Sequence, residues 1–232
     1  MTRLPRVTLV RQFDTHRLVP SRYLKSGDSV LARLVDDDDD LEAIFELDAA
    51  TNDRLIAEHQ RFPGIGIEEL VFGIPWSPVI NAAFCHAHPL GGRFNGPDRG
   101  AWYAAFSLDT AQAEVAFHKS VELAETAWTD EMSITCDDYL ADFSAEFHDL
   151  RKGGGFQACL NPKSYVASQA LAERLLDAGS LGVVYPSVRQ ADGTCLACFR
   201  PALVANVRRA ATYRFTWTGT DPPAIVRQRQ RP

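Results

Sequence analysis

The sequence predicts an α+β fold in which helices flank a mixed or antiparallel sheet, and two segments carry this prediction. In the first, the apolar run WYAAF at residues 102–106 is typical of a buried strand, and a helix is expected from about residue 110 to 124. In the second, a helix within residues 161–179 is followed at once by strand 182–187 and, after the turn-like QADG, by strand 195–199. Strands joined by so short a turn pair antiparallel, which favours a hairpin within the sheet.

Start and stop signals support both helices. Asp109 and Gln112 have the spacing of a capping box at the start of the first helix. In the second helix Pro162 lies near the first turn and Gly179 stands at the stop position. The local signals therefore agree with the predicted order of loop, strand, helix and then helix, strand, strand.

Length and composition indicate one globular domain, with or without a small added subdomain. The chain has 232 residues, of which 46% are hydrophobic and 23% charged, and this excludes disordered, collagenous and coiled-coil proteins. A formal charge of -6 argues against nucleic-acid binding through overall charge. No stretch approaches the roughly 18 apolar residues of a membrane-spanning helix, and the N-terminus lacks a signal-peptide core. We therefore expect a soluble cytoplasmic protein with no membrane contact.

The five cysteines make an odd number without framework spacing, which suits a reducing compartment. Cys195 and Cys198 have the spacing of a metal or redox pair, but no second pair or nearby histidine completes a tetrahedral site. Their apolar surroundings favour buried cysteines of a strand. No metal is expected.

The chain divides into three sections. Residues 1–80 are predicted to form a helical and loop extension packed on the core, with a solvated acidic turn at 36–40, one or two amphipathic helices within 41–59, and loops with one or two short strands in 61–84. Residues 81–217 form the main domain. The polar, Arg-rich residues 218–232 are predicted to be a flexible tail.

Motifs of P-loop, dinucleotide-binding, zinc-protease and hydrolase folds are absent, but four residues suit chemistry on a nucleotide. Arg93, in a glycine-rich loop, can bind a phosphate with two parallel hydrogen bonds, and Tyr103 can stack on a flat ring. Glu114 can stabilise a positive charge that develops on a sugar carbon, while Ser187 can hydrogen-bond an amide or a phosphate. Spacing alone leaves open that each of them is an ordinary surface or core residue.

Four ordered segments resemble the RES-domain family, which is named for an Arg, a Glu and a Ser. They are GGRFN at 91–95, WYAAF at 102–106, AEVAFH at 113–118, and GVVYPSVR at 182–189 with the CLACFRP that follows. The resemblance covers about residues 80–205. It implies a fold similar to ADP-ribosyltransferases, an activity that consumes NAD, and a role as a bacterial toxin encoded beside an Xre-type helix-turn-helix antitoxin.

Residue by residue, the resemblance implies a site on the main domain, residues 81–217. Arg93, Glu114 and Ser187 match the catalytic positions, and Arg93, Asn95, Tyr103 and Ser187 the NAD-binding ones. His88 is a further polar candidate just upstream of Arg93. Many family members carry a Tyr-Arg pair about 20 residues before that arginine, where this chain reads NAAFCHAH. Arg22 and Tyr23 are the candidates to replace the pair, with Asn81 as the alternative.

The expected function is that of a toxin that degrades NAD by cleaving its nicotinamide–ribose bond, with water or inorganic phosphate as acceptor. NAD would be the substrate, and no metal cofactor is expected. Two alternatives remain open, a transferase that attaches ADP-ribose to a metabolic enzyme and a non-catalytic module that binds a nucleotide or a partner. The expected partner is an Xre-type antitoxin, and a homodimer also stays open.

Overall fold

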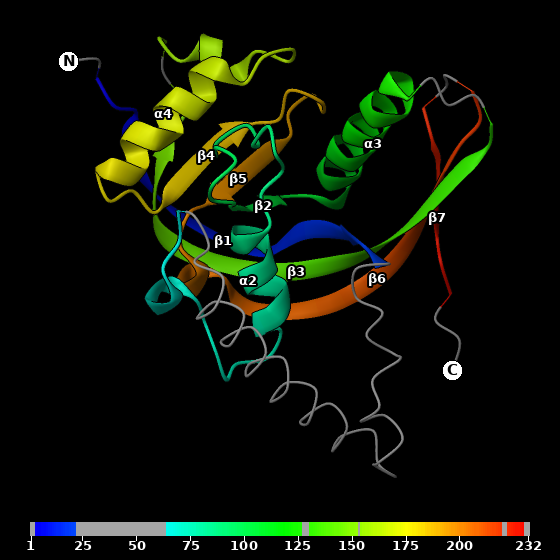
Figure 1. The fold of residues 1–232 in the computed structure, drawn as a ribbon, viewed down its shortest axis with the longest axis horizontal. Helices are drawn as coiled ribbons and strands as arrows, with labels where there is room; N and C mark the ends of the chain where they lie inside the picture. The colour runs from blue at the N-terminus through cyan, green and yellow to red at the C-terminus, as the bar shows by residue number, and fades with distance from the viewer. Residues whose placement is uncertain (1–2, 22–63, 127–129, 153, 220–221, 230–232) are drawn as a thin grey trace.

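The fold is described from a computed structural model that covers residues 3–21, 64–126, 130–152, 154–219 and 222–229 (Figure 1). Within these ranges the chain forms a seven-stranded sheet with helices, which confirms the predicted α+β class. The strands are β1 (Arg6–Pro20), β2 (Trp102–Ala105), β3 (Met132–Asp149), β4 (Gly182–Pro186), β5 (Thr194–Cys198), β6 (Ala205–Trp217) and β7 (Ala224–Arg227). The helices are α2 (Ser77–Cys85), α3 (Leu108–Glu125) and α4 (Val166–Asp177), with the 3-10 turns η3 (Ile67–Glu69), η4 (Gln157–Leu160) and η5 (Pro201–Leu203).

Five strands of the sheet close into a ring. β2 and β4 pair antiparallel with β5, β4 runs parallel to the end of β3, and β3 pairs antiparallel with β1 from Arg6 to Pro20. The ring closes where His16 of β1 pairs with Ala105 of β2. β6 pairs antiparallel with β3 on the edge opposite β1, and β7 pairs in turn with β6, so these two strands extend the sheet beyond the ring.

Alternation along the short strands separates an inner from an outer apolar layer. Along β5, Leu196 and Cys198 join the inner cluster, whereas Cys195 and Ala197 join the outer one. All five ring strands contribute to the inner cluster, whose members from the strands are Val10, Trp102, Ala104, Tyr139, Ala141, Phe143, Phe147, Val184, Leu196 and Cys198. The two cysteines are buried on opposite faces, which confirms their prediction as strand cysteines.

Helix α2 packs against the inner cluster and corrects the sequence prediction, which assigned residues 61–84 to loops and short strands. Pro78 stands in its first turn, where its missing N–H and fixed φ suit a helix start. Ile80 and Phe84 then recur at helical spacing and are both buried. The backbone N–H of Gly100 donates to the carbonyl of Phe84 at 2.8 Å, and a Cβ on Gly100 would collide with the backbone of α2.

A β-bulge bends β1 just before the ring closes. Gln12 pairs with Phe143 and Thr15 with Ala141, so two residues of β1 stand opposite the single Asp142 of β3. The extra residue returns Thr15 to the interior, where its hydroxyl donates to the carbonyl of Ala141 at 2.7 Å.

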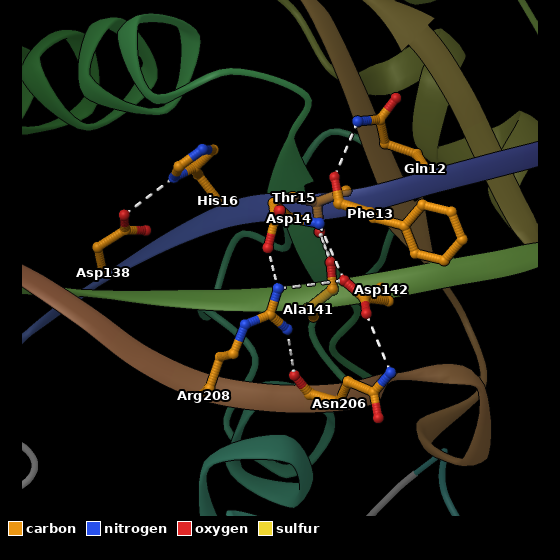
Figure 2. Close-up of polar contacts among 10 residues, drawn as sticks. All are labelled: Gln12, Phe13, Asp14, Thr15, His16, Asp138, Ala141, Asp142, Asn206 and Arg208. Carbon is orange, nitrogen blue, oxygen red and sulfur yellow. Dashed lines mark hydrogen bonds and ion pairs between the residues drawn. The ribbon is translucent and has the colours of Figure 1, made fainter.

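Figure 2 shows the polar cluster that holds this bulge across three strands. Asp14 takes a left-handed conformation (φ 53°), and its N–H donates to one carboxylate oxygen of Asp142 at 2.9 Å. Asn206 of β6 donates to the other oxygen at 3.0 Å, and Arg208 forms an ion pair with Asp14. Phe13 points away from the cluster and is largely exposed.

The structure also corrects parts of the predicted sections. Residues 6–20 form a sheet strand instead of a helical or loop extension, because β1 finds its hydrogen-bond partners far away in β3. Part of the predicted flexible tail is strand β7, which pairs with β6. The acidic turn at 36–40 and the helices within 41–59 lie outside the described residues.

Both predicted helices are present, although their starts differ from the prediction. α3 begins after Ser107, whose hydroxyl accepts the N–H of Thr110 at 3.3 Å, so Ser107 and not Asp109 is the N-cap. α4 begins at Val166, after Pro162 and not around it. The predicted hairpin of β4 and β5 is confirmed by their register.

A three-residue ion cluster joins the segment before α2 to the core. Glu69 accepts two hydrogen bonds from the guanidinium of Arg99, at 2.6 and 2.8 Å, and a third from Arg200 at 2.6 Å. These bonds, those of Arg99 first, lower the pKa of Glu69 to about 2 from its ordinary value of 4.5. Arg99 also donates to the carbonyls of Gly64 and Phe199, which links the cluster to the main chain on both sides.

We predict that this cluster loses its stabilising effect in acid. Because the pKa of Glu69 is lower in the folded state, its contribution is complete above about pH 4.5 and is lost as pH falls toward about 2. Glu69→Gln should therefore lower the free energy of unfolding at pH 7 and flatten its dependence on pH in that window. Urea unfolding of both proteins at several pH values measures this difference. Parallel curves would contradict the prediction.

Candidate functional site

The candidate site lies on the outer face of β2, β5 and β4. Figure 1 shows α3 and α4 on the same side of the sheet, with these three strands between them. Alternation turns Tyr103, Cys195 and Tyr185 toward this face, because their neighbours Trp102, Ala104, Val184 and Leu196 fill the ring. The strand register therefore decides which side chains meet the loop before β2 and the first turns of α3.

The glycine-rich loop before β2 is held by a tyrosine hydroxyl. Tyr103 accepts the backbone N–H of Phe94 at 2.8 Å and donates to the side-chain oxygen of Asn95 at 2.7 Å. Burial raises the pKa of Tyr103 far above its ordinary value, so the hydroxyl keeps its proton. Gly92 lies so close that a Cβ there would meet both Asn95 and Tyr103. Tyr103 and Asn95 thus fix the shape of the loop that carries Arg93.

Arg93 is a buried cation without a carboxylate partner among the described residues. Its exposed fraction is 7%, and Nη1 donates to the carbonyls of Cys159 at 3.1 Å and Asn161 at 2.9 Å. The guanidinium lies over the ring of Tyr165, 4.6 Å from the ring centre. Carbonyls and a ring face orient the group but leave its charge uncompensated, which is the state that favours an anionic ligand.

Glu114 is the seventh residue of α3 and is anchored through one oxygen. Ser187, directly after β4, donates its hydroxyl to Oε1 at 2.7 Å, and the thiol of Cys195 lies 3.7 Å from the same atom. Oε2 lies 3.9 Å from Nε2 of His118, and 23% of the Glu114 side chain is exposed. The carboxylate is therefore held through Oε1, whereas Oε2 has no hydrogen bond within the described ranges.

Two pKa shifts connect the separate parts of the site. Burial raises the pKa of Tyr185 well above its ordinary value, Glu114 raises it further, and Arg93 lowers it. Desolvation lowers the pKa of His118 below its ordinary value of 6.5, and Arg189, Arg93 and His88 lower it further. Glu114 acts in the opposite direction and raises it. Arg93 and Glu114 form no ion pair in the described ranges, yet each of them shifts the pKa of both Tyr185 and His118. An anchored carboxylate beside an uncompensated guanidinium can bind an anionic substrate and stabilise a developing cation.

Comparison with protein families matches residues 70–218 to the RES domain. The chain belongs to the RES-domain family. No curated protein matches this chain. Among solved structures, a chain of the M. tuberculosis MbcT–MbcA toxin–antitoxin complex is similar, with a TM-score of 0.41 and 16% sequence identity, over 57% of this chain and 73% of that chain.

The RES domain brings most of the predicted site residues to one face, but not all of them. Arg22 and Tyr23 lie outside the described residues. Asn81, the alternative to that pair, uses its amide to bind both the N–H and the carbonyl of Val71. His88 is an exposed turn residue whose Nδ1 accepts the N–H of Leu90 at 3.1 Å.

Sequence reasoning missed three contacts of this RES domain. Tyr165 stacks on Arg93, the thiol of Cys195 contacts Glu114, and Arg189 lies over the ring of Phe117. Arg189 and Cys195 had a signal, because Arg189 ends the GVVYPSVR segment and Cys195 begins the CLACFRP segment, whereas Tyr165 had none. Among the described residues, no three His, Cys, Asp or Glu side chains are grouped to hold a metal ion, and no helix is long and apolar enough to span a membrane.

We predict that Tyr103→Phe loosens the glycine-rich loop. The change leaves the N–H of Phe94 and the amide of Asn95 without their shared partner, and such a loss costs about 1–2 kcal/mol of stability. Urea unfolding measures the difference. Tyr213→Phe is the matched control, since that hydroxyl makes no hydrogen bond within the described part of the chain. Equal stability of the two variants would contradict a special role for Tyr103.

Proposed function

We propose that this protein is the toxin of a bacterial toxin–antitoxin pair and that it cleaves the nicotinamide–ribose bond of NAD. The observation that carries the proposal is the carboxylate of Glu114, held through Oε1 by Ser187, on the same sheet face as the uncompensated guanidinium of Arg93. Membership of the RES-domain family supports it. We take residues 81–217 as the catalytic unit, with NAD as its substrate.

In this mechanism Arg93 binds the pyrophosphate and the glycine-rich loop positions the nucleotide. The electrons of the C1′–N bond move to the pyridinium nitrogen, so nicotinamide leaves as a neutral molecule. The free oxygen of Glu114 stabilises the oxocarbenium-like sugar. An oxygen of water or of inorganic phosphate then bonds to C1′, and its proton passes to solvent. The products are nicotinamide and either ADP-ribose or its 1″-phosphate.

We predict that Glu114→Gln folds normally but cleaves NAD about 100-fold more slowly or worse, because the developing cation loses its counter-charge. The assay incubates purified protein with NAD, with and without inorganic phosphate, and separates the products by chromatography and mass. Glu125→Gln, an exposed position at the end of the same helix, is the matched control. Undiminished turnover by a folded Glu114→Gln protein would overturn the assignment.

The same assay separates the acceptors. ADP-ribose marks hydrolysis, and its phosphorylated form marks phosphorolysis. If nicotinamide appears only when cell lysate is added, and a biotinylated NAD labels a protein, the acceptor is a protein instead. Tight nucleotide binding without any turnover would indicate a binding module.

We also propose a cytoplasmic location and an Xre-type helix-turn-helix antitoxin as the partner. The location follows from the substrate, an intracellular dinucleotide. Induction of the toxin alone should lower cellular NAD and arrest growth, and co-expression of the antitoxin gene should restore both. Arrest that is equally strong with Glu114→Gln would separate toxicity from NAD cleavage.

A further inference from the structure

Arg189 occupies a junction beside the candidate site that the proposed mechanism does not use. It belongs to the turn between β4 and β5, and its backbone N–H donates to the hydroxyl of Ser187 at 3.1 Å. Its guanidinium carbon lies 3.2 Å from the centre of the Phe117 ring on α3. Nη2 donates to the carbonyl of Pro162 at 2.7 Å. The side chain therefore touches the turn, α3 and the segment that leads to α4.

The charge of Arg189 has no carboxylate partner within the described part of the chain, and its buried Nε makes no hydrogen bond. A buried donor without a partner is unfavourable, more so when it carries charge. Arg93 rests on the same segment, through the carbonyls of Cys159 and Asn161. Two guanidinium groups thus share one short segment, and within the described ranges neither of them has a carboxylate partner.

Glu114, which shares Ser187 with this turn, does not remove this imbalance. Glu114 is engaged through Oε1 by Ser187, and its other oxygen faces His118. Arg189 and Arg93 both lower the pKa of His118, whose ring lies 3.9 Å from Oε2 of Glu114, so both guanidinium groups lie near this part of the site. Paired planar donors of this kind match the oxygens of phosphate, whose charge exceeds that of one carboxylate.

We propose that Arg189 binds a phosphoanion beside Glu114, as a second anion-binding arginine in addition to Arg93. The phosphoanion is either the pyrophosphate of the dinucleotide or free phosphate that acts as the acceptor. The inference rests on the proposed function, because it assigns this ligand to the same site. The stacking on Phe117 and the bond to Pro162 orient the guanidinium before the ligand arrives.

The test compares wild type with Arg189→Met, which keeps the packing on Phe117 without the charge, and with Arg189→Lys, which keeps the charge without the paired donors. Initial rates are measured against NAD at several phosphate concentrations. A charged hydrogen bond that is lost should raise one apparent constant about tenfold or more. A rise in the KM for NAD identifies the dinucleotide as the source, and a rise in the phosphate constant identifies free phosphate. Arg11→Gln, an exposed arginine of β1, should change neither.

Unchanged constants in a folded Arg189→Met protein would overturn the inference. If that variant fails to fold, unchanged constants in Arg189→Lys overturn it equally. Calorimetric titration with ADP and with inorganic phosphate separates this result from failure of the proposed function. If anion binding depends on Arg189 but NAD is not cleaved, the proposed function is wrong and the anion site stands. If NAD is cleaved but anion binding does not depend on Arg189, the proposed function stands and the anion site is wrong.

Discussion

The closure of the strand ring at β1 is the constraint on which the rest of the molecule depends. β1 pairs with β3 along one of its edges, and on the other edge it pairs with β2 through His16 and Ala105. Because side chains alternate, a slip of β2 by one residue would exchange Trp102 in the interior with Tyr103 at the site. The bulge at Phe13 and Asp14 shifts the alternation of β1 side chains by one residue, between its pairing with the end of β3 and its pairing with β2.

The outer face of the ring holds charged groups through neutral partners. Arg93 is oriented by two carbonyls and an aromatic ring, and Glu114 by a hydroxyl and a thiol. Among the described residues neither group has a Lys, Arg, Asp or Glu as its ion-pair partner, and the only charged-type contact is His118 at 3.9 Å from Glu114. The cluster of Glu69 with Arg99 and Arg200 shows the contrasting arrangement, in which acid and bases neutralise one another and serve the fold. The difference between neutral and charged partners therefore separates the candidate site from the structural ion cluster.

The sequence predicted those elements whose signals are local. β2, the hairpin of β4 and β5, and the helices α3 and α4 each have an apolar run or a stop residue within a few positions. β1 could not be found in this way, because the bulge interrupts its alternation and Val7 and Leu9 are exposed. β3 contains the adjacent acids Asp137 and Asp138, which are buried only because Arg209 on β6 and His16 on β1 meet them. Partners so distant in the chain leave no local pattern.

The site was predicted through family resemblance, and its contacts depend on how α3 docks. Ser187 connects several parts of the candidate site. Its hydroxyl accepts the N–H groups of Arg189 and Gln190, which shapes the turn, and donates its proton to Glu114. One oxygen atom thus joins the position of the carboxylate to that of the turn carrying Arg189. Since that turn follows β4 directly, the register of the ring determines how far Arg189 lies from the carboxylate of Glu114.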